Sequence, residues 1–422
     1  MIKALRGTQD ILPPESEQWR YVEEMIRKLC AQYGFQEIRT PHFEKTELFQ
    51  RGIGETTDVV SKEMYTFTDR GDRSLTLRPE NTAAAVRAYL EHKVYADQNV
   101  TKWYYIGSMF RYDRPQAGRY REFHQFGVEV LATPSPQADG EIIALAVQLF
   151  QTLGLHDLNV FVNSVGCPKC RPVYREKLIA YYEDHQDELC EDCKTRLYKN
   201  PLRLLDCKEE ACQKLAQDAP EITEYLCEEC ADHFAATQKL LTAAGIPFTL
   251  NPRLVRGLDY YTKTAFEIQY APLGAQSAIC GGGRYDGLVE EIGGPHTPGI
   301  GFAVGLERLM LALSMQDLLP EVTAAGDVAI ATHGEAASEL GFAIAQELRA
   351  ANFTVDTDLL GRSLKSRLKQ VGKTGTKYVI IIGETELADG TVIIRDLAAR
   401  EQTTLARSEV VGYLQNERER RG

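Results

Sequence analysis

Arginines crowd one short stretch of the chain, residues 109–130, which reads MFRYDRPQAGRYREFHQFGVEV. Four of them stand close together around its middle: Arg111, Arg114, Arg119 and Arg121. Arginine suits bidentate recognition of phosphate better than lysine does, because its guanidinium presents a planar fork of donors. The stretch therefore predicts a place where phosphate is bound.

The residues that follow these arginines alternate in polarity. Side chains two positions apart share one face of a β-strand, so one face would hold Phe126, Val128 and Val130. The opposite face would present an aromatic ring, an amide and a carboxylate, which are Phe123, Gln125 and Glu129. The solvent-facing side of a half-buried sheet is the commoner origin of such polar residues. Because four arginines adjoin these polar residues, we favour a binding site over a solvent-facing side of the sheet.

Three other segments carry residues of chemical interest: Glu80, Thr82, Arg256, Tyr260, Tyr261 and Arg308. The first two lie in LTLRPENTAAAVR (residues 75–87), where a carboxylate and a hydroxyl can also simply support the first turn of a helix. RGLDYYTKTAFEI (256–268) sets an arginine four residues before a tyrosine pair. GIGFAVGLERLMLAL (299–313) leaves its arginine off the apolar stripe of a helix. Taken singly, each arginine fits an ordinary surface residue.

Eight of the ten cysteines lie between positions 167 and 230, as CPKC, CEDC, CKEEAC and CEEC. They are Cys167, Cys170, Cys190, Cys193, Cys207, Cys212, Cys227 and Cys230. Two thiolates three positions apart can grip one tetrahedral zinc ion, so eight ligands could close two four-sulfur sites. Disulfides and free thiols are the alternatives, and the spacing leaves the pairing open. Cys30 and Cys280 stand apart and are expected in the core.

Composition and charge narrow the class of protein. The 422 residues suggest two or three domains, and 44% hydrophobic with 26% charged residues is ordinary for a globular chain. The net charge, 48 − 60 = −12, argues against binding nucleic acid with the whole surface. No apolar stretch reaches the ~20 residues of a membrane span. The start, MIKALRGTQDILPPES, has no apolar region typical of a secretory signal, so we expect a cytoplasmic protein.

The elements that must position these residues can be read from periodicity. We expect a helix over residues 16–32, an antiparallel hairpin over 101–131, and a helix capped by Asp139 that stops at Gly154. Residues 166–245 have a helical pattern, strand-like sequence resumes at 254–270, and 299–304 is a strand that runs into a helix at 305–313. From residue 327 strands and helices alternate, which indicates a small α/β domain with a largely parallel sheet.

Common nucleotide-binding motifs are missing. GKT at 372–374 lacks the first glycine of a phosphate loop, and GGGRYDG at 281–287 lacks the third glycine of a dinucleotide fingerprint. Any phosphate chemistry must therefore use arginines from an antiparallel sheet.

Together these segments resemble a class II aminoacyl-tRNA synthetase, and specifically the histidyl-tRNA synthetase family, over essentially the whole length. The stretch around Pro41 resembles the first class motif, FRYDRPQAGRYREFHQ the second and GIGFAVGLERL the third. RGLDYYTKTAFE and CGGGRYDGL resemble the two peptides peculiar to the histidine enzymes. The resemblance implies an α+β catalytic domain on a mainly antiparallel sheet (1–165 and 246–325). A helical cysteine-rich insertion (166–245) would interrupt it, and a C-terminal α/β anticodon-binding domain (326–422) would follow.

The resemblance also implies the roles of individual residues. Histidine would be held by Glu80, Thr82, Gln125, Glu129, Tyr260 and Tyr261. Arg111 and Arg256 would act on the α-phosphate of ATP as electrostatic catalysts, since neither can lose its proton. Further ATP contacts would come from Arg119, Arg121, Phe123 and Arg308. Mg²⁺ would accompany ATP. The cysteine-rich insertion departs from many family members, which lack these thiols, so structural Zn²⁺ there is expected from the thiol spacing and not from the resemblance.

The same resemblance implies the partners: tRNA(His), L-histidine and a second copy of the chain in a homodimer, with no membrane. Six cations between Arg362 and Lys377 have no acid among them and favour a phosphate-binding surface, although a solvated helix face is the plainer interpretation. The alternative is a non-catalytic, synthetase-like regulatory subunit of histidine biosynthesis. Such proteins typically lack the anticodon domain and the substrate-binding peptides, and both are expected here.

Overall fold

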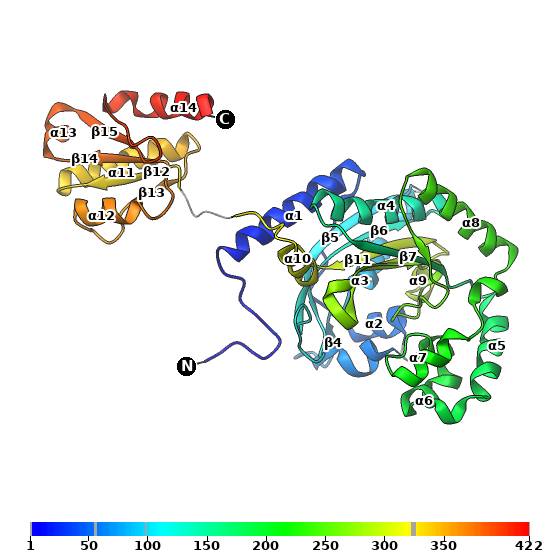
Figure 1. Cartoon of the computed structure of the whole chain (residues 1–422). Coiled ribbons are helices and arrows are strands. Elements are labelled where there is room, and N and C mark those ends of the chain that lie inside the picture. The colour runs from blue at the N-terminus through cyan, green and yellow to red at the C-terminus, as the bar shows by residue number, and fades with distance from the viewer. Residues whose placement is uncertain (1, 55–56, 98, 322–325, 422) are drawn as a thin grey trace. The chain divides into compact units, whose positions relative to one another are not determined.

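A computed structural model of the chain describes residues 2–54, 57–97, 99–321 and 326–421. The chain divides into two compact units, Met1–Pro320 and Glu321–Gly422, which are described separately (Figure 1). The larger unit is α+β and is built on one large sheet, and the smaller has a sheet of its own. This confirms the predicted fold class.

The large sheet has eight strands and is mainly antiparallel. In spatial order they are β1 (Gln36–Glu37), β5 (Thr101–Phe110), β6 (Glu122–Leu131), β11 (Gly299–Gly305), β10 (Ala278–Arg284), β9 (Thr262–Tyr270), β7 (Leu158–Ser164) and β8 (Thr249–Leu250). Only the outer pairs β1–β5 and β7–β8 are parallel. The hairpin predicted over residues 101–131 is β5–β6, with Trp103 opposite Glu129 and Gly107 opposite Gln125.

One face of this sheet carries the main hydrophobic core. It is covered by α1 (Glu15–Gln32), α4 (Pro136–Thr152), α8 (Glu228–Ala243) and α10 (Leu306–Met315) (Figure 1). Phe126, Val128 and Val130 of β6 are buried in it, as the alternation predicted. The polar residues of β6 consequently face the other side of the sheet, where α3 (Thr82–Glu91) and α9 (Leu288–Glu291) pack.

A second, small sheet lies beside α2 (Thr46–Ile53). Its strands, in the order β2 (Phe43–Lys45), β4 (Ser74–Leu77) and β3 (Tyr65–Thr68), are antiparallel. Pro41 falls between β1 and β2, outside both strands. β4 leads into α3, and this connection carries Glu80 and Thr82.

The cysteine-rich segment begins as a helical lobe with a core of its own. The lobe contains α5 (Arg171–Glu183), α6 (Glu191–Lys199) and α7 (Glu210–Gln217), packed around buried Tyr174, Leu178, Tyr182 and Leu197. The last helix of the segment, α8, packs differently. Its Phe234 and Leu241 belong to the main core, beside α4.

Two local predictions are wrong. Asp139 does not cap α4: the helix begins at Pro136, and the side chain of Ser135 accepts the N–H of Gln137. A proline favours the first turn of a helix, so Ser135–Pro136 outcompetes the later aspartate. Strand-like sequence was expected from Leu254, whereas β9 starts only at Thr262. The intervening loop, residues 255–261, lines cavities instead.

Asp139 instead anchors a fully buried ion pair. Arg284, at the end of β10, contacts both oxygens of its carboxylate and also donates to the carbonyls of Thr133 and Ser135. His233 of α8 lies 3.0 Å from the same carboxylate through Nε2. The pair therefore joins α4, α8 and the sheet inside the core.

Replacing Arg284 by methionine is expected to destabilise the larger unit by about 3–5 kcal/mol, because it leaves the Asp139 carboxylate buried without its cation. Urea unfolding followed by circular dichroism measures the loss. Arg39→Met is the matched control: the Arg39 side chain is 80% exposed beside Glu37, so it should cost no more than about 1 kcal/mol. Equal midpoints for Arg284→Met and the wild-type protein would contradict the assigned role of the pair.

The smaller unit is a five-stranded sheet with helices around it. Its strands, in spatial order, are β13 (Val355–Asp356), β12 (Val328–Thr332), β14 (Tyr378–Ile382), β15 (Thr391–Asp396) and β16 (Gln402–Ala406). The helices are α11 (Glu335–Ala350), α12 (Leu364–Val371), α13 (Glu384–Asp389) and α14 (Val410–Arg421). β12 pairs in parallel with β13 and β14, as expected. β14–β15 and β15–β16 are antiparallel, so the prediction of a largely parallel sheet is wrong for half of the pairings.

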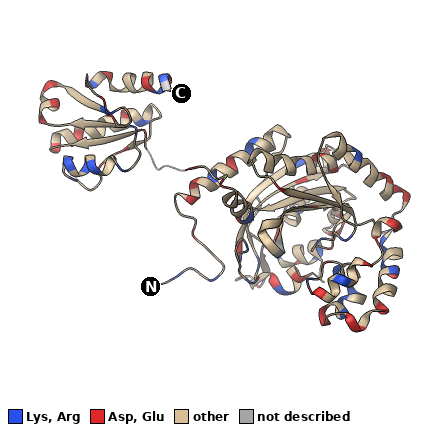
Figure 2. Ribbon diagram, in the orientation of Figure 1, with Lys and Arg blue, Asp and Glu red and all other residues tan. Residues whose placement is uncertain are grey.

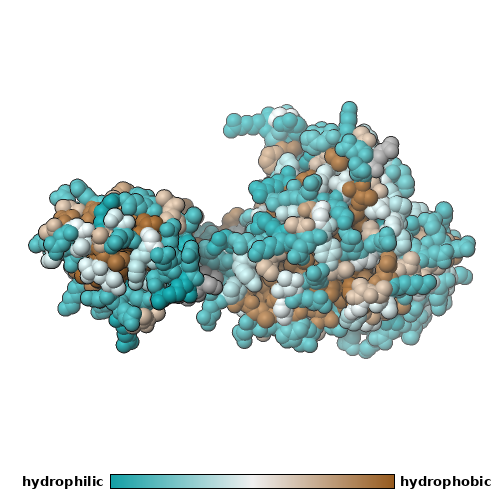
Figure 3. Space-filling model, turned by 90° about the horizontal axis from the view of Figure 1, so that it is seen from above, coloured by the Kyte–Doolittle hydropathy of each residue, from teal (hydrophilic) through white to brown (hydrophobic). Residues whose placement is uncertain are grey.

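The visible surface of each unit is mainly hydrophilic (Figure 3), as the ordinary share of charged residues in the sequence suggests. Hydrophilic residues dominate the face of each unit shown in Figure 3, with smaller hydrophobic groups between them. None of the described helices combines the length and the apolar character needed to cross a membrane.

Candidate active site

Two adjoining cavities open on the polar side of the large sheet. The smaller has a volume of about 200 Å³ and the larger about 640 Å³. Arg111, Gln125 and Arg256 line both, so these residues mark the junction. Among the described residues, Oε1 of Gln125 and Nε of Arg256 are buried without a hydrogen-bond partner. Buried polar atoms are nearly always paired, and an unpaired one at a cavity wall indicates a place for a ligand.

Glu129 lies at the base of the smaller cavity and is almost fully buried. Three hydroxyls donate to its carboxylate: Thr82 at 2.8 Å, Tyr105 at 3.2 Å and Tyr285 at 2.5 Å. Burial nevertheless raises the pKa of Glu129 to about 8, because the charged form loses its hydration. A ligand with a hydrogen-bond donor or a positive charge would favour the ionised form.

Glycines on the neighbouring strands make room for these groups. Gly301 on β11 is the cross-strand partner of Glu129, and a Cβ there would lie 2.1 Å from Oε2 of the carboxylate. Gly127 pairs with Tyr105, and its Cβ would lie 2.3 Å from the phenol oxygen. A larger residue at either position would displace the polar group from the cavity.

Glu80 and Thr82 reach the same cavity from the start of α3. The Glu80 carboxylate accepts the backbone N–H groups of Thr82 at 2.7 Å and of Ala83 at 2.9 Å. It is buried, and burial raises its pKa. The predicted helix-supporting role is thus real, and it fixes both side chains in the cavity wall at the same time.

Tyr260 and Tyr261, just before β9, also line the smaller cavity. Their ring centroids are 4.7 Å apart, and Tyr260 also lies edge-on to Tyr285 at 5.7 Å. Both tyrosines are buried. The smaller cavity is therefore bounded by carboxylates, hydroxyls and aromatic rings, a lining suited to a small polar ring.

Arg111 and Arg256 approach the junction from different elements. Nε of Arg111 donates to the carbonyl of Pro79 at 2.8 Å, and its guanidinium lies 5.4 Å from the centre of the Phe123 ring. Arg256 is paired with Glu267 of β9. Gly281 makes room for Arg256, since a Cβ there would lie 1.9 Å from its guanidinium. Each of the two cations at the junction is thus held in its orientation by its own neighbours.

The larger cavity contains three more of the predicted residues, Arg119, Phe123 and Arg308. Arg119 is paired with Asp113, and Nη1 of Arg308 donates to the carbonyl of Ala278 at 2.8 Å. Arg121 does not line either cavity: its guanidinium lies 3.9 Å from the centre of the Tyr112 ring. All residues predicted to bind the substrates histidine and ATP therefore line one or both of these cavities, with the exception of Arg121.

Sequence reasoning missed four residues that hold the site in place. Tyr105 and Tyr285 bind the Glu129 carboxylate, and Glu267 pairs with Arg256. Glu307 accepts the backbone N–H of His124 at 2.8 Å and 3.0 Å, which ties α10 to β6. Once the register of β5–β6 is known, Tyr105 falls on the same face as Gln125 and Glu129.

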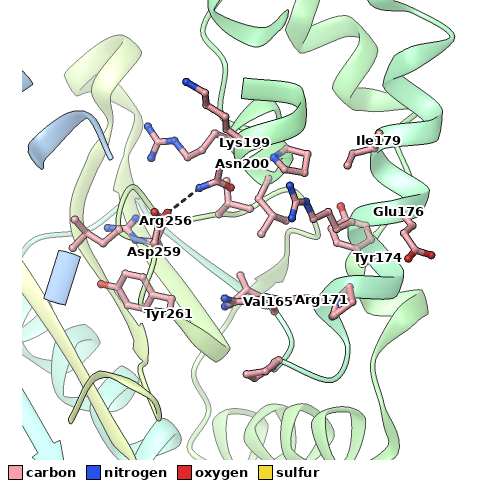
Figure 4. A pocket seen from close by; sticks show the side chains of 18 residues that line it. Val165, Arg171, Tyr174, Glu176, Ile179, Lys199, Asn200, Arg256, Asp259 and Tyr261 are labelled. Atoms are coloured by element: carbon pink, nitrogen blue, oxygen red, sulfur yellow. Dashed lines mark hydrogen bonds between the residues drawn. The ribbon is translucent and has the colours of Figure 1, made fainter. Parts of the chain in front are cut away.

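A third cavity, of about 580 Å³, lies between the helical lobe and the loop of residues 255–261 (Figure 4). Arg171 and Tyr174 line it from α5, and Arg256 and Tyr261 line it from the loop of residues 255–261. The side chain of Asn200 bridges the two sides by donating to Asp259 at 2.9 Å. The lobe is thus in direct contact with the loop that carries the junction arginine.

The eight clustered cysteines form two groups of four. Cys167, Cys170, Cys227 and Cys230 make one, and Cys190, Cys193, Cys207 and Cys212 make the other. The ligand atoms within each group lie within 4.8 Å of one another, so each group could hold a metal ion. Cys30 and Cys280 are buried elsewhere in the main core, as predicted.

Comparisons with known proteins agree with this architecture. A family model described as histidyl-tRNA synthetase matches residues 7–171 and 176–309, and one described as anticodon binding domain matches 327–417. The histidine–tRNA ligase of Desulforamulus reducens is 53% identical over 409 residues, covering 97% of this chain and 98% of the relative. That of Desulfitobacterium hafniense is 55% identical over 404 residues, covering 96% and 95%.

A solved structure gives the same result. The apo histidyl-tRNA synthetase of Staphylococcus aureus superposes with a TM-score of 0.84 at 40% identity, covering 98% of this chain and all of the other. The match extends across both units, so neither the catalytic nor the anticodon-binding part is missing. The chain belongs to the histidyl-tRNA synthetase family.

Proposed function

We propose that the protein attaches L-histidine to tRNA(His) in two ATP-dependent steps. Histidine first attacks the α-phosphate of ATP to form histidyl-adenylate, and the terminal ribose of the tRNA then takes the acyl group. The observation that carries the proposal is the junction, where Arg111 and Arg256 stand between a small carboxylate- and phenol-lined cavity and a larger arginine-lined one. An amino acid in the first and a nucleotide in the second would meet at these two cations.

In this assignment the smaller cavity binds histidine. Glu129 and Tyr261 would hydrogen-bond the two nitrogens of the imidazole, with Tyr260 shaping the pocket. Glu80, Thr82 and Gln125 would hold the α-ammonium group, and the unpaired Oε1 of Gln125 supports this placement. Because a substrate without the ring nitrogens leaves buried polar groups unpaired, discrimination of about 10⁴-fold is expected without editing.

The larger cavity would bind ATP. Phe123 and Arg308 would lie on either side of the adenine, with Arg308 also reaching the γ-phosphate and Arg119 the distal phosphates. Arg121, which lies outside the cavity lining, is left as a candidate contact of the tRNA acceptor end. Mg²⁺ would arrive bound to the β- and γ-phosphates, and Glu267 and Glu307 offer carboxylate oxygens of the kind it prefers.

Arg111 and Arg256 would supply the catalysis. Negative charge grows on the α-phosphate oxygens in the transition state, so two fixed guanidinium groups stabilise that state more than the ground state. Their partners, the Pro79 carbonyl and the Glu267 carboxylate, hold them in position before ATP arrives. No proton transfer by either arginine is required.

The smaller unit would bind the anticodon part of the tRNA. The ribbon of α12 carries several Lys and Arg positions, coloured blue in Figure 2. Arg367 does not belong to the exposed set, because it is buried and donates to the carbonyls of Ile330 and Asp356. Lys365, Lys369 and Lys373 are exposed and remain the candidate phosphate contacts.

A Lys365→Glu/Lys369→Glu double variant is expected to raise the KM for tRNA(His) about tenfold, with the defect shrinking as ionic strength rises, because phosphate contacts are salt-dependent. ATP–pyrophosphate exchange with histidine should be unchanged. Charging of tRNA with labelled histidine measures the first effect. Arg400→Glu/Arg420→Glu, which alters two other exposed cations of the same unit, is the control. Failure of the wild-type protein to charge tRNA(His) would refute the proposed function.

The remaining assignments rest on the reaction, on the family and on the cysteine groups. With tRNA and ATP as substrates, we place the protein in the cytoplasm, and the family resemblance supports a homodimer. We also propose structural zinc in the cysteine-rich segment, supported by the two groups of four thiols. The regulatory-subunit alternative is disfavoured, because the matched relatives span both units, including the anticodon-binding part.

A further inference from the structure

We propose that the cysteine-rich segment binds two zinc ions in two nested sites, and that the outer ion fastens the helical lobe to the catalytic unit. The outer site consists of Cys167, Cys170, Cys227 and Cys230, and the inner site of Cys190, Cys193, Cys207 and Cys212. This proposal rests on the zinc-binding role of the segment and is independent of the histidylation reaction.

The distances between sulfurs fit a tetrahedral zinc site. Four sulfurs at the usual ~2.3 Å from zinc lie about 3.8 Å from one another. The Sγ–Sγ distances are 3.6 Å for Cys167–Cys170, 3.9 Å for Cys167–Cys227 and 3.8 Å for Cys190–Cys207. A disulfide would bring two sulfurs to about 2.05 Å, and all eight cysteines are free thiols in the structure.

Backbone N–H groups also point at these sulfurs. In the outer site the N–H of Lys169 donates to Cys167 at 3.3 Å, and that of Cys227 donates to Cys170 at 3.1 Å. In the inner site the N–H of Cys190 donates to Cys212 at 3.4 Å. Such hydrogen bonds orient metal ligands and stabilise the thiolate form that zinc requires.

The outer site has almost no hydrocarbon core of its own. Cys167, Cys170 and Cys230 form a separate buried cluster, against which only Leu226 and Cys227 pack among the described hydrophobic residues. So little apolar surface cannot hold two segments together, whereas a four-thiolate zinc ion can. The inner site differs, since its cysteines lie within the larger core of the lobe.

The position of the outer site gives it a mechanical role. Its first two ligands come just after β7, and its last two lie at the start of α8, so one ion would close the segment at its entrance and exit. Arg171 is the residue after Cys170. Its Nε donates to the carbonyl of Val165 at 3.2 Å, and its positive charge interacts with the sulfurs of Cys167 and Cys170. It also lines the cavity shared with Arg256 and Tyr261. The outer zinc would therefore fix one wall of that cavity.

Metal analysis of the full chain, grown with zinc, tests the proposal. We expect two equivalents of zinc per chain, one equivalent for Cys170→Ser/Cys230→Ser, one for Cys193→Ser/Cys212→Ser, and two for the control Cys30→Ala. Zinc released from the wild-type protein by a thiol-modifying reagent, detected with a colorimetric chelator, gives the same count without any variant. Cobalt in place of zinc should show the absorption bands of tetrahedral sulfur coordination.

The location of the sites has a separate readout. Limited proteolysis of the outer-site variant should free the whole lobe, with cleavage near residues 165–170 and 226–231. In the inner-site variant, cleavage should be confined to residues 186–226. Fewer than 1.5 equivalents in the wild-type protein, or one pair of substitutions removing both ions, would overturn the two-site proposal. A protein that holds zinc but shows no histidine-dependent ATP–pyrophosphate exchange would refute the proposed reaction and leave the metal sites standing. A protein that shows this exchange but holds no zinc would refute the metal sites.

Discussion

Replacing Arg256 by alanine is expected to slow histidyl-adenylate formation by about 10²–10³-fold, the usual effect of removing one donor aimed at a developing charge. Arg256 stands at the junction of the two cavities, where the proposed reaction would place the α-phosphate, so the substitution would remove a positive charge beside it. The measurement is histidine-dependent ATP–pyrophosphate exchange. The loss should fall mainly on kcat, because the interaction strengthens in the transition state.

Two companion variants sharpen this prediction. Arg256→Lys keeps the charge but not the planar fork and should recover only part of the rate. Arg114→Ala removes an exposed arginine of the hairpin turn and should leave exchange unchanged. An Arg256→Ala protein that folds normally and exchanges within threefold of the wild-type rate would contradict the catalytic role.

Changing Glu129 to glutamine is expected to lower kcat/KM for histidine by about 10³-fold or more, because the amide cannot become negatively charged and turns one acceptor oxygen of a buried site into an NH₂ donor. Gly301→Ala should produce a similar loss without touching the carboxylate chemically, because the new Cβ would occupy the space of the Glu129 side chain. Exchange kinetics over a range of histidine concentrations measure both effects. Gly287→Ala, at a glycine with open space around it, is the control. Normal histidine kinetics in both variants would refute the assigned pocket.

The raised pKa of Glu129 adds a second readout. With a pKa of about 8, the carboxyl is mainly protonated at pH 7 in the free enzyme. If it ionises to accept the imidazole N–H, histidine binding should release close to one proton at pH 7 and far less above pH 9. Calorimetry in two buffers of different ionisation enthalpy counts that proton, and Glu129→Gln should abolish the release.

The raised pKa of Glu129 also makes the free energy of unfolding depend on pH. The folded pKa lies above the ordinary value of 4.5, so the folded state binds the proton more tightly than the unfolded chain. The protonated Glu129 therefore stabilises the folded state fully below pH 4.5, the pKa of the group in the unfolded chain. This stabilisation is lost as the pH rises through about 8, the pKa in the folded state.

Sequence periodicity predicted the elements with strong local signals. The alternation in β6 placed Phe126 and Val128 in the core and Gln125 and Glu129 on the opposite face, and both placements are confirmed. Asp139 was misassigned because a good local cap looks the same in sequence whether it faces an N–H or a buried arginine. Its partner Arg284 lies 145 positions away, and a single sequence does not reveal that contact.

The contacts that sequence periodicity did not predict depend on how strands distant in the sequence pair with one another. Tyr105 and Tyr285 meet at Glu129 only because the four strands β5, β6, β11 and β10 pair in one particular register. The sequence of one hairpin does not specify that register. The nested pairing of the cysteines depends likewise on how the chain returns to β7 after the lobe. The antiparallel strands β15 and β16 were missed for different reasons: β16 is a mostly exposed edge strand with a weak apolar pattern, whereas β15 lies inside the sheet but buries only alternate residues.

ATP–pyrophosphate exchange with each of the twenty amino acids, supplied singly, tests the central claim most directly. The account predicts exchange with histidine alone, about 10⁴-fold above every other amino acid. Exchange driven by a different amino acid would contradict the histidine pocket. Absence of exchange with all twenty, in a folded protein supplied with Mg²⁺ and ATP, would contradict the adenylate-forming site itself.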